Sequence, residues 1–170
     1  MPMIISDEFD RILNYAADEA MRTGSMEVGA DHLLLAIIRD GENEAADILR
    51  MLGVDLQECK HFIESRISHG AMVPFADRDN VRLSREAGSL INMSMAESER
   101  AGGTVTGTAQ ALSALMGLSG GAGRMYLSEL GVTAGAVRSL AAEHGKPKPD
   151  VPHPNVQFIG IFNTNNKTVS

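Results

Sequence analysis

The sequence matches itself when it is shifted by 78 positions, so that residues 5–54 align with residues 83–132 without a gap. The identities include charged, polar, glycine and apolar positions, a mixture that a chance register would not produce. Such a repeat means that one structural unit occurs twice and that each copy needs its neighbour to bury its apolar face. The identical pairs are Ser6 and Ser84, Glu8 and Glu86, Asn14 and Asn92, Glu19 and Glu97, Arg22 and Arg100, Gly24 and Gly102, Gly29 and Gly107, Leu34 and Leu112, Ala36 and Ala114, Leu49 and Leu127, Leu52 and Leu130, Gly53 and Gly131, and Val54 and Val132.

The first copy has the pattern of four helices. After Ser6, a residue type that caps helices, apolar side chains recur at helical spacing on one face. Residues 33–38 are apolar all round, which predicts a helix at the buried centre of the repeat. Asn43 can cap a third helix, and Asp55 with Glu58 makes a capping-box pattern for a fourth.

The second copy repeats these elements, with Thr133 in the cap position of its last helix. Gly53 and Gly131 stand where a left-handed residue ends a helix, and Gly29 and Gly107 close the loop before the buried helix of each copy. We assign structural roles to these four glycines. The expected fold is all-α, a tandem duplication of a four-helix repeat packed with pseudo-twofold symmetry, with eight helices and no core strand.

Proline and glycine mark the expected boundaries. The segment from residue 147 has four prolines within a stretch of ten residues, so we expect residues 147–170 to be an extended tail or linker. Inside it, an apolar patch at residues 156–162 leaves two alternatives open, docking on the domain or remaining mobile. The rest of the chain, residues 1–146, is predicted to form one domain. Within it we expect the first repeat at about 5–68, a linker at 69–82 and the second repeat at about 83–144.

Composition excludes several classes of protein. The formal net charge of −7 argues against nucleic acid as a partner, because binding to a phosphate backbone depends on clustered lysine and arginine. Cys59 is the only cysteine, so no internal disulfide can form and a reducing cytoplasm is the expected compartment. The sequence has neither the pattern of a signal peptide nor a run of roughly 18 apolar residues that could span a membrane.

The first copy contains a recognisable series of motifs. The series is a loop with Gly29 and Asp31, the run His32–Leu35, the turn Arg39–Glu42 and the ending Leu49–Val54. This series resembles the amino-terminal domain of the Clp-family unfoldases, most closely the ClpA and ClpC branch. The resemblance covers residues 5 to about 144 and recurs in both copies. It implies a non-catalytic, all-helical domain that recognises adaptor proteins or protein substrates and passes them to an ATP-driven threading ring.

The sequence departs from the family at two points. No phosphate-binding loop of the form G-x-x-x-x-G-K-[ST] occurs in it, so we expect this chain not to hydrolyse ATP. In some members a glutamate before the histidine contributes to binding phosphorylated arginine, and a carboxylate suits a guanidinium. Here Asp31 and Ala109 occupy these positions, so we expect at most one such site, at Asp31. The other candidate binding residues are Ala30 and Thr108 beside these positions and Asp40 and Glu42 in the acidic turn.

The Asp31 and His32 pair also admits a functional interpretation, as a metal ligand or as an acid–base pair at a helix start that acts with Ser25 or Cys59. No second ligand lies at zinc-like spacing, and the second copy has Gln110 in place of His32. A position that accepts histidine or glutamine suits a structural hydrogen bond, so we favour a structural role for His32. Likewise Cys59 corresponds to Val137, which favours a small buried side chain.

We therefore expect a protein-interaction domain that recognises adaptors or substrates of an ATP-dependent Clp unfoldase. The partners are proteins, namely adaptors and unfolded or tagged substrates, including phosphoarginine-bearing ones. The sequence places two methionines in loops, Met26 and Met72, and soft side chains of this kind suit a surface that binds varied polypeptides. We expect no metal, no cofactor and a monomeric state. A free-standing regulator that occupies Clp adaptors, or a small enzyme using Asp31 and His32, are the alternatives.

Overall fold

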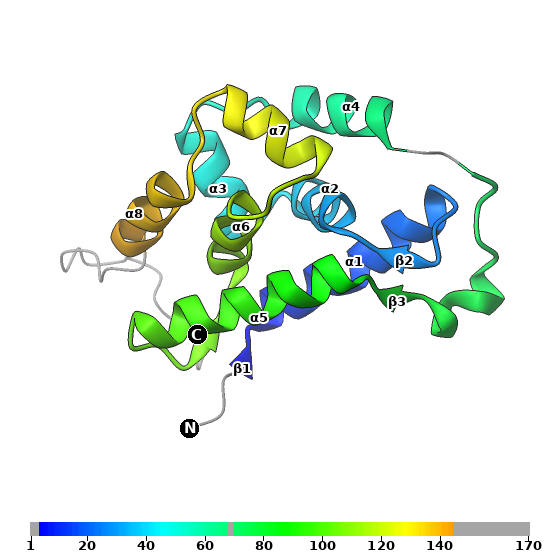
Figure 1. The fold of residues 1–170 in the computed structure, drawn as a ribbon, viewed down its shortest axis with the longest axis horizontal. Helices are drawn as coiled ribbons and strands as arrows, with labels where there is room; N and C mark the ends of the chain where they lie inside the picture. The colour runs from blue at the N-terminus through cyan, green and yellow to red at the C-terminus, as the bar shows by residue number, and fades with distance from the viewer. Residues whose placement is uncertain (1–3, 68–69, 145–170) are drawn as a thin grey trace, which may run out of the picture.

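The computed structural model describes residues 4–67 and 70–144, and these form eight α-helices, one 3-10 helix and four two-residue strands (Figure 1). The elements of the first copy are β1 (Ile4–Ile5), α1 (Asp7–Arg22), β2 (Glu27–Val28), α2 (Ala30–Asp40), α3 (Glu44–Met51) and α4 (Leu56–Arg66). After the 3-10 helix η1 (Phe75–Asn80), the second copy has β3 (Arg82–Leu83), α5 (Arg85–Arg100), β4 (Val105–Thr106), α6 (Thr108–Met116), α7 (Ala122–Glu129) and α8 (Ala134–His144). The predicted all-α duplication is confirmed. The expected tail at 147–170 and its apolar patch lie outside the described residues.

The helices begin at the cap residues that the sequence indicates. The Ser6 hydroxyl accepts a hydrogen bond from the Phe9 N–H at 3.0 Å, and Ser84 accepts one from Ala87 at the same distance. Such side-chain caps satisfy backbone donors that have no partner within the helix. The other predicted caps act in the same way, namely Asn43 on Ala46, Asp55 on Gln57 and Glu58, and Thr133 on Ala136.

The strands were not predicted, and they join the two copies. β1 pairs in parallel with β4, and β2 pairs in parallel with β3. In these pairs Ile4 lies opposite Val105 and Glu27 lies opposite Arg82. The shift of 78 positions converts one pair into the other, because residues 4 and 27 correspond to 82 and 105. Each pair therefore links one repeat to the other across the pseudo-twofold axis.

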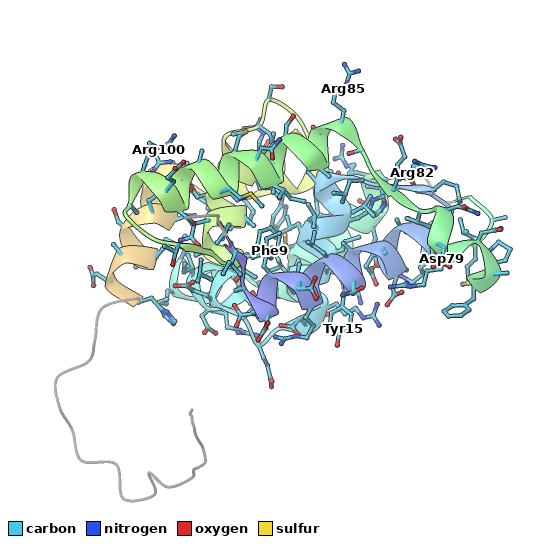
Figure 2. All side chains as sticks on the ribbon, turned by 90° about the horizontal axis from the view of Figure 1, so that it is seen from below. Phe9, Tyr15, Asp79, Arg82, Arg85 and Arg100 are labelled. Carbon is cyan, nitrogen blue, oxygen red and sulfur yellow. The ribbon has the colours of Figure 1, made fainter. Side chains whose placement is uncertain are left out.

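The core is centred on the second helix of each copy. α2 and α6 lie between α4 and α7 on one side and α1 and α5 on the other (Figure 1). Every residue from 33 to 38 is at most 5% exposed, as expected for a helix that is apolar all round. In Figure 2, Phe9 lies inside the molecule and Tyr15 lies at its edge. Across the repeats, the rings of Phe62 on α4 and Tyr126 on α7 are 5.0 Å apart.

The segment between the copies runs along the end of α1. The Gly70 N–H donates to the Thr23 carbonyl, and the Val73 N–H donates to the Met21 carbonyl, both at 3.0 Å. Gly24 has a φ of +81°, and a Cβ there would lie 2.7 Å from the backbone of residues 70 and 71. Glycine at position 24 therefore lets the returning chain approach α1 closely.

Candidate functional site

Asp31 lies at the junction of the two repeats. Its carboxylate oxygens accept hydrogen bonds from the N–H groups of Ala122 at 3.1 Å and Gly123 at 2.9 Å. These are the first two residues of α7, where the helix presents unpaired donors and favours negative charge. Both carboxylate oxygens of this candidate ligand for a guanidinium are thus already bonded to the protein backbone.

The corresponding helix of the first copy, α3, is capped from the second copy. Thr108 Oγ1 accepts a hydrogen bond from the Ala45 N–H at 3.0 Å and donates to Glu8 Oε1 at 3.1 Å. Glu8 Oε1 also accepts from the Glu44 N–H. Thr108 is 0% exposed and Ala30 is 3% exposed, so neither candidate binding residue is accessible from outside.

His32 bonds within its own repeat. Its Nδ1 accepts from the Gly29 N–H at 2.9 Å, and its Nε2 lies 3.2 Å from Thr23 Oγ1. This geometry requires the neutral tautomer with the proton on Nε2. Burial lowers the pKa of the imidazole below its ordinary value. In the second copy Gln110 Oε1 accepts from the Gly107 N–H at 2.9 Å, which reproduces the Nδ1 contact.

The acidic turn is only partly available to a partner. The Asp40 side chain is 7% exposed and pairs with Arg11, whose Nε lies 2.8 Å from Oδ1. The hydrogen bond from Arg11 lowers the pKa of the Asp40 carboxyl, and Asn43 Nδ2 donates to the same group at 2.8 Å. Glu42 is exposed. Of this pair, Asp40 therefore ties the turn to α1, and Glu42 presents its charge to solvent.

The nucleophiles of the enzymatic alternative are buried or already hydrogen-bonded. Cys59 is 0% exposed, and burial raises the pKa of its thiol to about 12, so it is not a thiolate nucleophile. The Ser25 hydroxyl donates to the Glu27 carbonyl at 2.7 Å. Among the described residues, no group of three or more His, Cys, Asp or Glu side chains could hold a metal ion. Nor is any helix within residues 4–67 and 70–144 long and apolar enough to cross a membrane.

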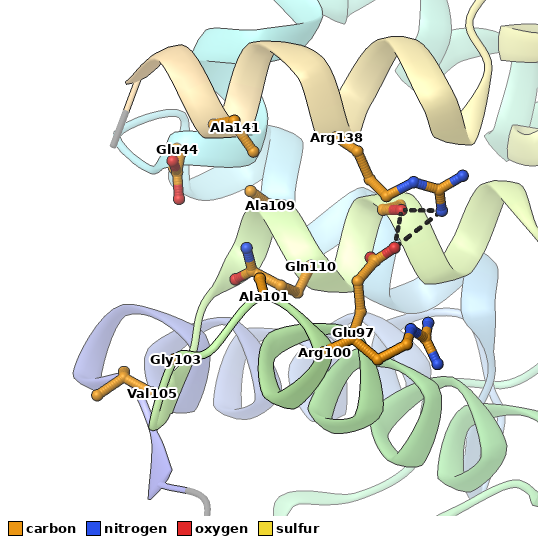
Figure 3. A pocket seen from close by; sticks show the side chains of 12 residues that line it. Glu44, Glu97, Arg100, Ala101, Gly103, Val105, Ala109, Gln110, Arg138 and Ala141 are labelled. Atoms are coloured by element: carbon orange, nitrogen blue, oxygen red, sulfur yellow. Dashed lines mark hydrogen bonds and ion pairs between the residues drawn. The ribbon is translucent and has the colours of Figure 1, made fainter. Parts of the chain in front are cut away.

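An accessible groove of about 950 Å³ lies beside the second copy (Figure 3). Its walls are α5, α6 and α8, and Glu44 of α3 lies at its far side. Glu97 on α5 and Arg138 on α8 form an ion pair at 2.8 Å, and the Ser113 hydroxyl donates to the same carboxylate oxygen at 2.9 Å. The lining residues are Glu44, Glu97, Arg100, Ala101, Gly103, Val105, Ala109, Gln110, Ser113, Arg138, Ala141 and Ala142.

The first copy has a smaller hollow of about 510 Å³ at the corresponding place. Its residues Glu19, Arg22, Leu35 and Lys60 correspond to Glu97, Arg100, Ser113 and Arg138 in the groove. Sequence reasoning missed the groove, although the retained pair of Glu19 and Glu97 was a signal. These glutamates lie on the inner side of helices, where a repeated acidic residue is unexpected.

A second exposed surface lies at the opposite end of the molecule, around β2, β3 and η1 (Figure 1). Apolar side chains there are open to solvent, Phe75 at 81% and Met72 at 68%. Met26 at 41% and Leu83 at 46% lie on the neighbouring strands or beside them. The two loop methionines that the sequence marked as adaptable contacts are therefore exposed, but they lie away from the groove.

The fold and the site define the class of protein. It is an all-α domain of two interlocked four-helix repeats, with a groove beside the second repeat. The Clp repeat (R) N-terminal domain family matches residues 4–130, and the chain belongs to this family. This confirms the resemblance that the sequence showed.

Two relatives are 26% and 29% identical to this chain over the residues that align. The negative regulator of genetic competence ClpC/MecB of Bacillus subtilis is 29% identical over 133 residues, which are 78% of this chain and 16% of that protein. The chaperone protein ClpB of Oceanobacillus iheyensis is 26% identical over 133 residues, with the same coverage. The matched part is thus a small fraction of these relatives.

Solved structures show the same fold. The N-terminal domain of Hsp104 from Candida albicans superposes with a TM-score of 0.67 at 15% identity, covering 85% of this chain and 93% of that one. The N-terminal domain of the chaperone ClpD from Arabidopsis thaliana gives a TM-score of 0.65 at 15% identity, covering 84% and 97%.

Proposed function

We propose that this chain is a non-catalytic interaction domain that recognises adaptors or protein substrates of an ATP-dependent Clp unfoldase in the cytoplasm. Family membership supports the class of function, and the groove supports the place where a partner binds. A volume of about 950 Å³ is at the upper end of the range typical of ligand sites. It is large enough for several residues of an extended chain.

The walls of the groove suit a polypeptide. Ala101, Gly103, Ala141 and Ala142 have small side chains, so the backbone of a partner can come close to the helices. Carboxylates and guanidinium groups both line it, as Glu97 and its neighbours show in Figure 3. A surface with small residues and charges of both signs can pair with varied sequences, as a substrate receptor requires.

Phosphoarginine recognition at Asp31 receives less support than binding in the groove. To pair with a guanidinium, the Asp31 carboxylate would have to release the N–H groups of Ala122 and Gly123 at the start of α7. At the corresponding position of the second copy, Ala109 is 0% exposed and carries no carboxylate. We therefore place the binding surface in the groove rather than at the helix starts.

The proposal is tested by binding of an unfolded protein. Ribonuclease A that is reduced and alkylated stays unfolded and can be titrated by calorimetry. Ala142 is exposed on α8 and lines the groove, so Ala142→Tyr should fill part of it and weaken binding by about tenfold or more. Ser139→Tyr is the matched control, because Ser139 is exposed on the same helix and does not line the groove. Equal affinities of the two variants would overturn the proposal.

A further inference from the structure

Glu97 has one carboxylate oxygen without a partner. Its Oε1 accepts hydrogen bonds from Ser113 and Arg138. Its Oε2 is buried and has no hydrogen-bond partner among the described residues. The side chain of Glu97 is 12% exposed. Buried oxygens of ionised carboxylates are almost always bonded, and leaving one unpaired destabilises the free protein. The unpaired oxygen therefore needs an explanation.

The first copy shows which kind of group bonds to the equivalent carboxylate oxygen. The corresponding residue, Glu19, accepts two guanidinium groups, Arg22 on Oε1 at 2.8 Å and Arg39 on Oε2 at 3.4 Å. Arg39 also lies 3.7 Å from Asp18 Oδ2, and its guanidinium carbon is 4.6 Å from the centre of the Tyr15 ring. An arginine thus lies beside Glu19 and completes its hydrogen bonding, and it lines the open hollow of about 510 Å³ in the first copy.

The second copy lacks that arginine and its supports. Gly117, Ala96 and Met93 stand at the positions that correspond to Arg39, Asp18 and Tyr15. A hollow of about 270 Å³, which we call the socket, lies beside these residues. Met93, Ala96 and Gly117 line it together with Glu97 and Arg138, and it adjoins the groove, with which it shares Glu97 and Arg138.

We infer that the socket receives an arginine side chain of a protein partner and that its guanidinium binds the Glu97 carboxylate, as Arg39 binds Glu19 in the first copy. Because Oε2 has no open surface in the free protein, the Glu97 side chain turns toward the socket when the arginine binds. This inference rests on the proposed function and names the chemistry of the partner. An apolar side chain would fill the socket but leave the oxygen unpaired. A guanidinium can bond the oxygen while its flat face lies on the exposed thioether of Met93.

The charges around the socket limit how strongly it binds one arginine. Arg138 already occupies Oε1, and Arg100 lies at the rim, but Glu19 shows that one carboxylate can hold two guanidinium groups. Ala96 offers no second carboxylate like that of Asp18. An isolated arginine should therefore bind with a Kd on the order of 1 mM, and contacts along the groove would supply the rest of the affinity.

The test uses the full chain and an arginine blocked at both ends, N-acetyl-arginine-N-methylamide. Its binding is followed by the amide NMR shifts of Ser113 and Gly117. We expect saturable shifts at these residues, and a binding about tenfold weaker for the citrulline analogue, which has the same shape without the charge. Absence of saturable shifts, or equal binding of citrulline, would overturn the inference.

Two substitutions test the inference by adding the arginine to the second copy or removing it from the first copy. Gly117→Arg should fill the socket from within and abolish the shifts at Ser113, because the φ of −86° at position 117 is open to any residue. The added Cβ would lie 3.3 Å from the Ala114 carbonyl oxygen, so a small local shift of the backbone accompanies the substitution. Arg39→Ala should leave Glu19 Oε2 without its arginine and add saturable shifts around Glu19. Retained binding in Gly117→Arg would contradict the inference. If arginine fails to bind while unfolded ribonuclease A still binds in the groove, the socket is wrong and the proposed function stands.

Discussion

At the scale of single residues, the two copies use different side chains for the same hydrogen bond at the start of the buried helix. His32 and Gln110 each accept a hydrogen bond from the glycine that begins the buried helix. The sequence predicted this kind of contact, because only a local acceptor explains why the position tolerates both residue types. It could not predict that Asp31 bonds to Ala122 and Gly123, since these partners are 91 and 92 positions away.

The histidine should make stability depend on pH. Because the pKa of folded His32 lies below the ordinary 6.5, the unfolded chain takes up a proton first as the pH falls through that value. The contribution of neutral His32 to the free energy of unfolding is fully present above about pH 6.5. It is lost progressively as the pH falls below this value. Protonation of Nδ1 would also break the bond from Gly29.

His32→Gln should remove this component and cost about 1 kcal/mol at pH 7, where the histidine is neutral. Urea unfolding at pH 7.5 and 5.0 would show a smaller loss of stability in the variant than in the wild type. The exposed His61→Gln is the control and should behave like the wild type. Equal pH dependence of all three proteins would show that His32 is not the sensitive group.

At the scale of elements, the third helix of each copy depends on the other copy. Asp31 of α2 caps α7, whereas Thr108 of α6 and Glu8 of α1 bond to the start of α3. Gly123 shows how tight this junction is, because a Cβ there would lie 2.3 Å from Leu34 Cδ2. In sequence alone this glycine indicates only a weak helix, because its meaning lies in a contact between elements far apart along the chain.

Asp31→Ala should therefore destabilise the whole fold by about 1 kcal/mol, in the range for loss of a helix cap. Thermal or urea unfolding measures this directly. Glu42→Ala, which removes an exposed carboxylate of the neighbouring turn, should be nearly neutral. If Asp31→Ala left stability unchanged, its two hydrogen bonds to α7 would not matter for the fold.

At the scale of the whole molecule, the helices, their caps and the duplication were predictable because they follow from local periodicity and from a repeat in register. The strand pairs and the groove were not, because two-residue strands carry no periodic signal and the groove depends on which side chains are small at the meeting point of three helices. Phe9 and Ile12 of the first copy lie in one core cluster with Leu112 and Leu115 of the second copy.

The two repeats should accordingly unfold as one cooperative unit. The parallel pairs β1 with β4 and β2 with β3 join the copies, and the helix caps cross between them. Fragments 1–70 and 80–146, expressed separately, should show no sharp thermal transition, whereas the full chain should show one. A cooperative transition in each fragment alone would contradict this prediction.

The central claim is that the groove, rather than the exposed apolar surface around Phe75, binds a polypeptide partner. Hydrogen exchange of the full chain, measured by mass spectrometry with and without unfolded ribonuclease A, tests it most directly. We predict slower exchange in α8 and in the backbone from 101 to 110 when the partner is bound. Protection confined to β2, β3 and η1, or no protection of α8, would contradict the account.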